Sequence, residues 1–380
     1  MATSETLIDQ ARDLASMVAP AANRINQERR IPEDIVRPII DAGHFRLLLP
    51  KTLGGSELDH PDFLKIVRTY AEADASVGWC INQNNVFSTN AVRVSAAVAE
   101  EIWGDPRNVV TNGPPRPGTK AVTADGGYTL SGRWDFSSGI SHASWIAALA
   151  PVHDANGNHT KEMRTFLLPK SQVEVVDEWF VGGLRGTASQ SFVMQDQFVP
   201  AERSYGLNEP SREPGPIYVI HTTPMFASGF ATVALGVARS GLDFAIDLTK
   251  RKIQHGGSLV VSADATTQRA VGQAEAAWNS ARAFLAEATT EMWDTVIESH
   301  ELPTPRRIKV RLAGTHATRT AAEVVNAAYT ICGSTAIFES NTIQRCFDDV
   351  HAIRQQIQGR PTHYDTAGQF YLGLEPKGIF

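Results

Sequence analysis

Two adjacent hydroxyl side chains, Ser137 and Ser138, end the stretch of the first half of the chain that is richest in residues capable of chemistry. The stretch, residues 126–145, begins at a glycine-rich turn and continues as a predicted β-strand. Hydroxyls at the end of a strand can form hydrogen bonds with the edge of a flat aromatic ligand. The alternative is that they only form the turn after the strand. Which serine would face a ligand stays open, because a register shift of one residue exchanges their sides.

Four consecutive amides, Asn82-Gln83-Asn84-Asn85, interrupt an otherwise apolar segment. Buried amide groups need hydrogen-bond partners, so a run of them inside a core is unusual. The run predicts a polar patch in a ligand pocket, lined by Asn82 and Asn85. A capped helix end is the alternative interpretation. Phe226 and Phe230, one helical turn apart in a later apolar segment, are predicted to line the same pocket.

Charge and composition narrow the classes of partner. The chain has 380 residues and a net charge of −6, which argues against general binding of nucleic acid or anionic membranes. The longest uncharged stretch, residues 217–238, is polar at its start and predicts a helix buried among other helices rather than a membrane span. The N-terminus lacks the basic and apolar regions of a signal peptide, which favours a cytoplasmic location.

Three cysteines, Cys80, Cys332 and Cys346, have no C-x-x-C spacing. They are predicted to be buried, reduced thiols in a reducing cytosol. The histidines show no pairing with Asp, Glu or Cys at ligand spacing, so no metal site is predicted.

The elements that position these residues fall into three predicted domains. Residues 1–115 show helical periodicity, for example at 32–42 and 62–75. Residues 116–210 alternate short β-rich runs with turn signals such as Asp125-Gly126 and Asn156-Gly157. Residues 211–380 are helical again, and the alanine-rich helices predicted at 274–293 and 309–331 suit a bundle. The predicted fold class is α+β, mostly α.

Short motifs in a fixed order along nearly the whole chain resemble the acyl-CoA dehydrogenase fold superfamily. They are Leu53-Gly54-Gly55, the run from Ala73 to Trp79, the segment 126–145, the run from Val181 to Ser189, Cys332-Gly333-Ser334 and the run from Asp348 to Ala352. Within that superfamily the chain is most similar to the two-component, group D flavin-dependent monooxygenases. The resemblance implies an N-terminal helical domain, a central β-barrel domain and a C-terminal four-helix bundle, assembled as a homotetramer with flavin sites at subunit interfaces.

The resemblance also implies an activity. A flavin reductase would supply reduced flavin, FMNH2 or FADH2, and molecular oxygen would be the co-substrate. A C4a-hydroperoxyflavin would then insert one oxygen atom into a small, largely apolar substrate that is aromatic, heterocyclic or an amine.

The resemblance assigns roles to particular residues. Trp134, Ser137 and Ser138 would lie beside the flavin ring, with the serines catalytic. Arg251 and Gln254 would contact the phosphate of a flavin bound by a neighbouring subunit. Gly333 and Ser334 would also lie near the flavin phosphates. Ser334 replaces the second glycine of the family, which weakens the case for FAD over FMN. His351 and Gln356 are further catalytic candidates from the last helices. Gln356 stands where many members have a histidine, and it can donate a hydrogen bond but cannot act as a base. A structural role for His351 is the alternative.

Two other activities stay open. An acyl-CoA dehydrogenase needs a carboxylate base to remove a proton from carbon, yet neither residues 214–241 nor residues 351–358 contain an Asp or Glu. That absence argues against a dehydrogenase, unless an unrecognised base serves. A non-redox enzyme on the same fold is the other alternative.

Overall fold

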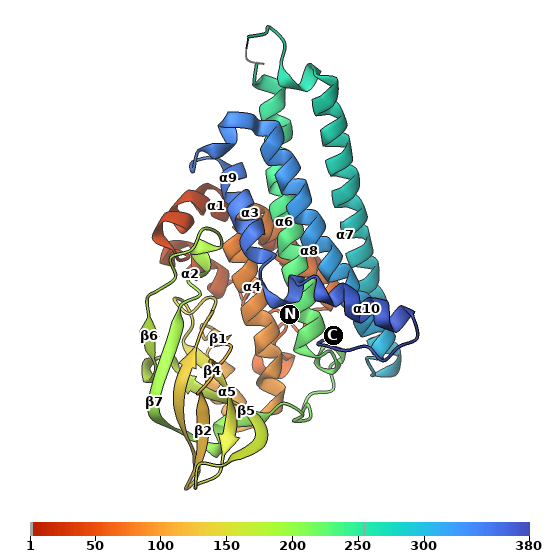
Figure 1. Cartoon of the computed structure of the whole chain (residues 1–380). Helices are drawn as coiled ribbons and strands as arrows, with labels where there is room; N and C mark the ends of the chain where they lie inside the picture. Colours follow the sequence, from red (N-terminus) through yellow and green to blue (C-terminus); the bar gives the residue numbers. More distant parts are fainter. Residues whose placement is uncertain (1–2, 254–255) are drawn as a thin grey trace.

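The computed structural model describes residues 3–253 and 256–380, and it places a sheet beside a tall group of helices (Figure 1). The N-terminal helices are α1 (Ser4–Glu28), α2 (Glu33–Asp41), α3 (His60–Ala73), α4 (Ala75–Ser88) and α5 (Ala96–Trp103). The sharp break between α3 and α4 comes from Asp74, whose extended backbone ends one helix. Its carboxylate accepts hydrogen bonds from the amides of Ser76 and Val77 at the start of the next. Every residue of α4 is buried, which makes it a central element.

The central domain is one eight-stranded sheet. Its strands are β1 (Val110–Gly113), β2 (Lys120–Ala124), β3 (Gly127–Trp134), β4 (Trp145–His153), β5 (His159–Pro169), β6 (Glu174–Val176), β7 (Ser191–Pro200) and β8 (Ser204–Gly206). They pair in the order β6-β7-β3-β2-β4-β5-β8, and β1 adds to β4 in parallel. Both predicted turns form: Gly126 lies between β2 and β3, and Gly157 between β4 and β5, each with the positive φ that glycine tolerates.

The predicted boundary at residue 116 differs from the structure at one point. β1 begins at Val110, inside the range expected to be helical. Four residues are too few to show alternation, and this strand is fixed by its pairing of Val110 with Trp145 rather than by its own sequence. The five-residue β2 and the three-residue β8 are likewise too short to show a clear alternation.

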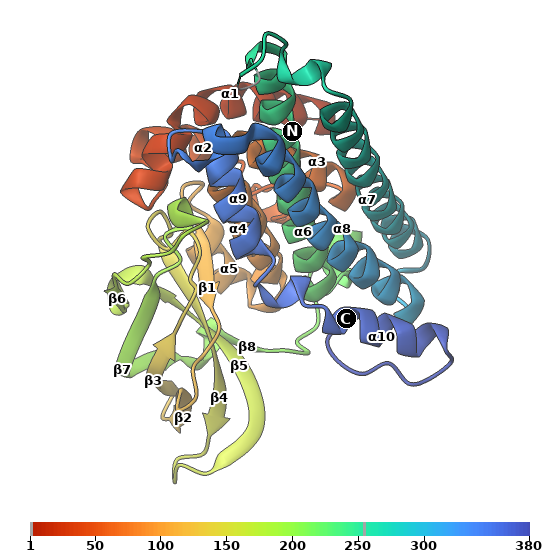
Figure 2. The same cartoon turned by 45° about the horizontal axis from the view of Figure 1, so that its top comes forward.

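The C-terminal helices form the bundle that the sequence predicts. α6 (Thr222–Arg251), α7 (Ala265–Ser299), α8 (Thr304–Cys332) and α9 (Thr342–Ile353) pack along one another, and α10 (Thr362–Tyr371) crosses the lower end (Figure 2). Small residues allow the close approach: a Cβ on Gly314 of α8 would lie 3.0 Å from the Ala227 carbonyl of α6. α6 is long and apolar enough to cross a membrane, but 83% of its most apolar window is buried inside the protein. This confirms the predicted buried helix.

Candidate active site

The two serines after β3 point in different directions. Ser137 is fully buried beneath β1, where its Oγ has no hydrogen-bond partner and would lie 2.5 Å from a Cβ on Gly113. Ser138 is turned toward α4, where its Oγ accepts a hydrogen bond from Trp79 Nε1 at 3.0 Å. The register question left open by the sequence is therefore answered for this chain: Ser138 faces the helices, and Ser137 faces the sheet.

A chain of hydroxyls continues behind Ser138. Ser138 Oγ lies 2.7 Å from Ser189 Oγ, which lies 2.6 Å from Thr187 Oγ1. Thr187 sits in the short helix η4 (Arg185–Thr187) and donates its one hydroxyl proton to the Leu184 carbonyl at 2.9 Å.

These bonds have only one consistent direction. Because Thr187 has used its proton, Ser189 must donate to Thr187, and Ser138 must donate to Ser189. Ser138 therefore presents a lone pair, not a proton, to any further partner.

Three aromatic rings form a row beside this chain. The indole of Trp79 stacks on Phe230 of α6, with ring centroids 3.9 Å apart and planes at 21°. Phe230 in turn stacks on Phe226 at 5.5 Å. Phe226 is half-buried, whereas Trp79 and Phe230 are buried. The row connects Ser138 to the N-terminal end of α6, where the half-buried Phe226 offers a flat, apolar surface of the kind that binds an aromatic ring.

The four amides lie in the interior of α4, so they do not cap a helix end. Asn85 is fully occupied: its Oδ1 accepts from the Leu47 amide, and its Nδ2 donates to the carbonyls of His44 and Ile81. Gln83 donates to Asn112 of β1 at 2.7 Å. Asn82 differs from them, because it is fully buried against Gly229 of α6 and neither atom of its amide has a partner.

Two of the four amides thus retain hydrogen-bonding capacity: Asn82 with both of its polar atoms, and Asn84 with its Oδ1. Asn85 instead fixes α4 to the segment before η1 (Lys51–Leu53).

At the end of β3, the exposed aromatic residue is Phe136 rather than Trp134. Trp134 is fully buried in the core of the sheet, stacks on Phe192 and donates its N–H to the Leu149 carbonyl, so its geometry is that of a packing residue. Phe136 is 61% exposed and has a φ of 55°, an uncommon conformation for a bulky residue. Strain of this kind concentrates at functional sites.

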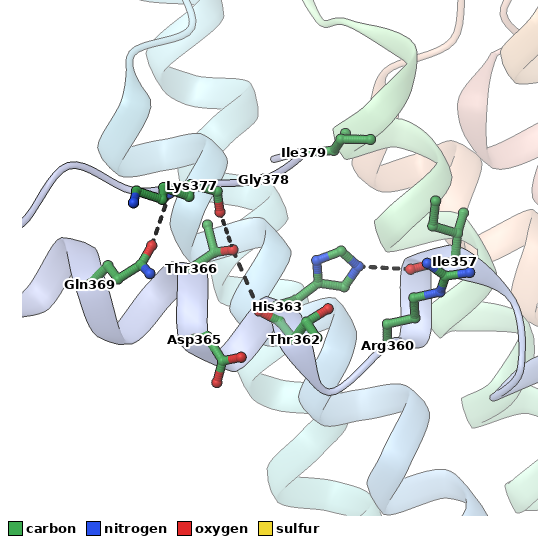
Figure 3. A pocket seen from close by; sticks show the side chains of 10 residues that line it. All are labelled: Ile357, Arg360, Thr362, His363, Asp365, Thr366, Gln369, Lys377, Gly378 and Ile379. Carbon is green, nitrogen blue, oxygen red and sulfur yellow. Dashed lines mark hydrogen bonds between the residues drawn. The ribbon is translucent and has the colours of Figure 1, made fainter.

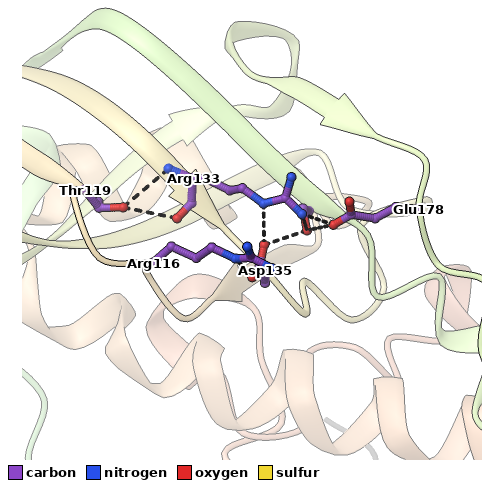
Figure 4. A network of polar contacts seen from close by, with 6 residues as sticks. Arg116, Thr119, Arg133, Asp135 and Glu178 are labelled. Carbon is purple, nitrogen blue, oxygen red and sulfur yellow. Dashed lines mark hydrogen bonds and ion pairs between the residues drawn. The ribbon is translucent and has the colours of Figure 1, made fainter.

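A polar network holds the strained turn in place (Figure 4). Asp135 is buried and binds Arg116 and Arg133, and it also accepts from Ser191 Oγ at 2.8 Å. Arg133 continues the network to Glu178. Burial acts to raise the pKa of the Asp135 carboxyl, but the hydrogen bonds from the two arginines and Ser191 outweigh it and lower that pKa. The carboxylate next to Phe136 is therefore ionised, neutralised and unable to act as a base.

Two further carboxyls, the buried Asp74 and the half-buried Asp349, lie where α4, α9 and η4 meet. Asp349 accepts a hydrogen bond from the Leu184 amide at 2.6 Å, and Asp74 caps α4. Burial raises the pKa of Asp74 to about 6 and that of Asp349 to about 7. Both groups bind main-chain amides of this chain, so each has a structural task.

The predicted phosphate-binding residues meet at the far end of the bundle. Arg251 is exposed at the end of α6 and pairs with Asp247 at 3.2 Å. The next residue, Lys252, donates to the Cys332 carbonyl at 2.7 Å and to Thr335 Oγ1 at 2.9 Å, which brings it against Gly333 and Ser334. Gln254 lies outside the described residues. The structure thus brings Lys252, the residue after Arg251, against Gly333, and Arg251, Gly333 and Ser334 are all exposed.

The last two catalytic candidates lie on different elements. His351 of α9 forms a 3.0 Å hydrogen bond with Asn326 of α8 and packs against Phe347, which favours its structural role. Gln356 precedes the short helix η9 (Ile357–Gly359), and its Oε1 accepts from the Gln358 amide at 2.6 Å. Gln358 binds Arg311 of α8, so Gln356 positions a segment that covers the start of α6 and α8.

The residues around Ser138 suit a flat ring system with polar edges. They offer an acceptor at Ser138, an orphaned hydroxyl at Ser137 and an exposed aromatic ring at Phe136, and the neighbouring Asp135 is already paired. These groups match a flavin, which would bring redox chemistry that no side chain here supplies. Within residues 3–253 and 256–380, no three His, Cys, Asp or Glu side chains gather as metal ligands would. The three cysteines are buried and unpaired, as predicted.

The class of protein follows from the fold and from comparison with known families. Residues 2–97 match the N-terminal domain of acyl-CoA dehydrogenases, and residues 228–360 match their C-terminal domain. The chain belongs to the acyl-CoA dehydrogenase family.

Its relatives define the branch. The pigment production hydroxylase of Rhodococcus erythropolis is 30% identical over 94% of this chain and 94% of its own length. Indole-3-acetate monooxygenase of Pseudomonas putida is 29% identical, over 98% and 94%. The oxygenase subunit HsaA of the flavin-dependent monooxygenase of Rhodococcus jostii is 28% identical, over 88% and 89%. The crystal structure of 3-HSA hydroxylase from Rhodococcus sp. RHA1 has a TM-score of 0.90 and 26% identity, covering 98% of each chain. The predicted resemblance to the monooxygenase branch is confirmed.

Three parts of the site escaped sequence analysis. Trp79 occurs in a motif that indicated the family but suggested no role, and Thr187 and Ser189 lie in another such motif. Arg311 sits in an amphipathic pattern that is typical of any surface helix, so only burial reveals it.

Proposed function

We propose that this chain is the oxygenase component of a two-component flavin-dependent monooxygenase. A separate reductase supplies FMNH2 or FADH2, and one atom of molecular oxygen enters a small, largely apolar substrate that is aromatic, heterocyclic or an amine. A cytoplasmic location is part of the proposal, supported by the three unpaired thiols.

The observation that carries the proposal is the position of Ser138 between the sheet and the aromatic row. Its lone pair is directed by the hydroxyl chain, and a ring N–H is the complementary partner. A reduced flavin carries such an N–H at N5, whereas an oxidised flavin presents an acceptor there. Ser138 is therefore the serine assigned to the flavin edge, and Trp79, Phe230 and Phe226 are assigned to the substrate ring.

The second part of the proposal is a homotetramer with shared flavin sites. Phe230, beside the Ser138 site, and Arg251, in the phosphate surface, are separated along α6 by about 30 Å at 1.5 Å per residue. One flavin does not span that length, so a phosphate held by Arg251 belongs to the ring site of another subunit. The exposed apolar side chains beside Arg251 support an interface: Ile253, Leu259, Ile337 and Phe338 are all more than half exposed.

The test is an anaerobic titration with FMNH2 and FADH2, followed by an oxygen pulse in the presence of small aromatic compounds. We expect tight binding of one reduced flavin, weaker binding of its oxidised form, and a hydroxylated product that contains oxygen from O2. A protein that binds neither reduced flavin would disprove the proposal. Tightly retained oxidised FAD that an acyl thioester bleaches would indicate a dehydrogenase instead.

A further inference from the structure

One buried cation has no counter-ion. Arg311 of α8 is 2% exposed, and its Nη1 donates to the neutral side chain of Gln358. Its Nε and Nη2 have no partner. Within the described part of the chain, no Asp or Glu forms an ion pair with it, whereas Arg306, on the same helix, pairs with Glu291.

An unpaired buried charge is expensive. Moving a guanidinium from water into a protein interior costs several kcal/mol unless an anion or a full set of acceptors compensates. Burial lowers the pKa of Arg311 to about 10, so the side chain still carries its charge at neutral pH. An anion bound to the two free donors would offset that cost.

The free atoms define the shape of that anion. Nε and Nη2 lie on one edge of the planar guanidinium, and their N–H groups run parallel, which is the geometry that binds both oxygens of a carboxylate. Gln358 holds the opposite nitrogen, Nη1, and so fixes the plane. The arrangement leaves a fork with two donors, prepared for a ligand.

The fork lies at the same end of the bundle as the aromatic row. Gly314, one helical turn after Arg311, packs against Ala227 of α6, and Ala227 follows Phe226. A cavity of about 360 Å³, shown in Figure 3, has Ile357 and His363 in its wall. Ile357 precedes Gln358, the residue that binds Arg311, so this cavity lies next to the segment that holds the guanidinium.

We propose that Arg311 binds the carboxylate of the substrate, so that the preferred substrates are small aromatic acids whose ring lies on Phe226 and Phe230. The inference rests on the proposed function for the ring site, but not on which flavin is used. It makes Arg311 a specificity residue: an uncharged analogue with the same ring would leave the fork empty.

Binding measurements with matched probes test this inference. Phenylacetate and 2-naphthylacetate, each beside its uncharged amide, are titrated by calorimetry into the full chain without turnover. A bidentate, charge-assisted contact predicts that the wild type prefers each acid over its amide by about 10- to 100-fold. Arg311→Met should remove that preference, and Arg311→Lys should keep only part of it. Arg306→Met, which removes an arginine from the same helix, should keep all of it.

The stability of the free protein separates ligand binding from a structural role. Since Arg311 has no anionic partner, Arg311→Met should melt at the same temperature as the wild type or higher. A clear fall in the melting temperature would overturn the inference, as would equal affinity of the wild type for acids and amides, or no binding of either acid. A different result would disprove the proposed monooxygenase function. In that case reduced flavin would not bind, while the wild type would still prefer acids over amides.

Discussion

The indole N–H of Trp79 donates to Ser138 Oγ at 3.0 Å, and this bond links a helix of the N-terminal domain to the turn after β3. The same indole stacks on Phe230 of α6. All three domains therefore meet at one side chain. The bond also fills one acceptor position of Ser138, whose proton goes to Ser189 because Thr187 donates to the Leu184 carbonyl.

Trp79→Phe should weaken the discrimination between reduced and oxidised flavin. The substitution keeps a ring on Phe230 but removes the donor that holds the Ser138 hydroxyl in place, so the Ser138 lone pair is no longer held toward the N5–H of a reduced flavin. We expect the ratio of the two dissociation constants to fall by about tenfold, the value of one hydrogen bond. Anaerobic titration with reduced flavin and aerobic titration with oxidised flavin measure this ratio. Trp278→Phe is the matched control, because Trp278 also loses one buried bond, to the Leu235 carbonyl. An unchanged ratio in Trp79→Phe would argue against the directed chain.

The two serines should respond differently to alanine. Ser138→Ala leaves the Trp79 N–H without its acceptor in a buried site, which should lower the free energy of unfolding by about 1–3 kcal/mol. Ser137→Ala removes a hydroxyl that has no partner, so its effect should lie within about 0.5 kcal/mol of zero or be stabilising. Urea denaturation of both variants compares them directly. Equal destabilisation would mean that the orientations found here are wrong.

Asp349 should make the protein less stable as the pH rises toward neutrality. Burial raises the pKa of its carboxyl to about 7, above the value of about 4 in an unfolded chain. Between those two values the folded state binds more protons than the unfolded state, so the free energy of unfolding falls with pH. The contribution of Asp349 is complete below about pH 4.

Asp349→Asn keeps an acceptor for the Leu184 amide and cannot ionise. It should therefore melt higher than the wild type at pH 8, with little difference at pH 4. The exposed Glu298→Gln on α7 provides the control for the loss of one negative charge. A gain in melting temperature that is the same at both pH values would exclude ionisation as the cause.

The contrast between Trp134 and Phe136 shows what the sequence could and could not predict. Strand β3 was predicted from its alternation and its turn, and the family resemblance predicts a flavin edge after it. Which aromatic side chain is exposed depends on the pairing of β3 with β7, which places Trp134 opposite Phe192 in the core. That pairing is a long-range contact with no local signal.

The burial of Arg311 also depends on long-range contacts and could not be predicted from the sequence. In the sequence it differs little from Arg306 and Arg307, which precede it on α8 and have partners at the surface. Only the approach of α6 through Ala227 and Gly314, and the cover provided by Gln358, buries it. Asn82 and Asn85 likewise belong to one run of amides, and the neighbouring backbone at residues 44–48 decides that Asn85 is satisfied and Asn82 is not.

Gly229 and Asn82 form a pair that a double-mutant cycle can test. A Cβ on Gly229 would lie 1.8 Å from Asn82 Oδ1, so Gly229→Ala forces the buried amide to move. Alanine is the better helix former by about 1 kcal/mol, yet overpacking should exceed that gain and destabilise the protein by about 1–3 kcal/mol.

Asn82→Ala should rescue Gly229→Ala, because it removes both the clash and a polar group without a partner. Gly272→Ala, at an exposed site of α7 where no atom lies within 4 Å of the added carbon, should show the helix-forming gain alone. Chemical denaturation of the wild type, the two single variants and the double variant completes the cycle. If Asn82 also binds the substrate, as its free amide suggests, Asn82→Ala should weaken ligand affinity while the free protein stays as stable as the wild type. Additive effects in the cycle would show that the two residues are not in contact.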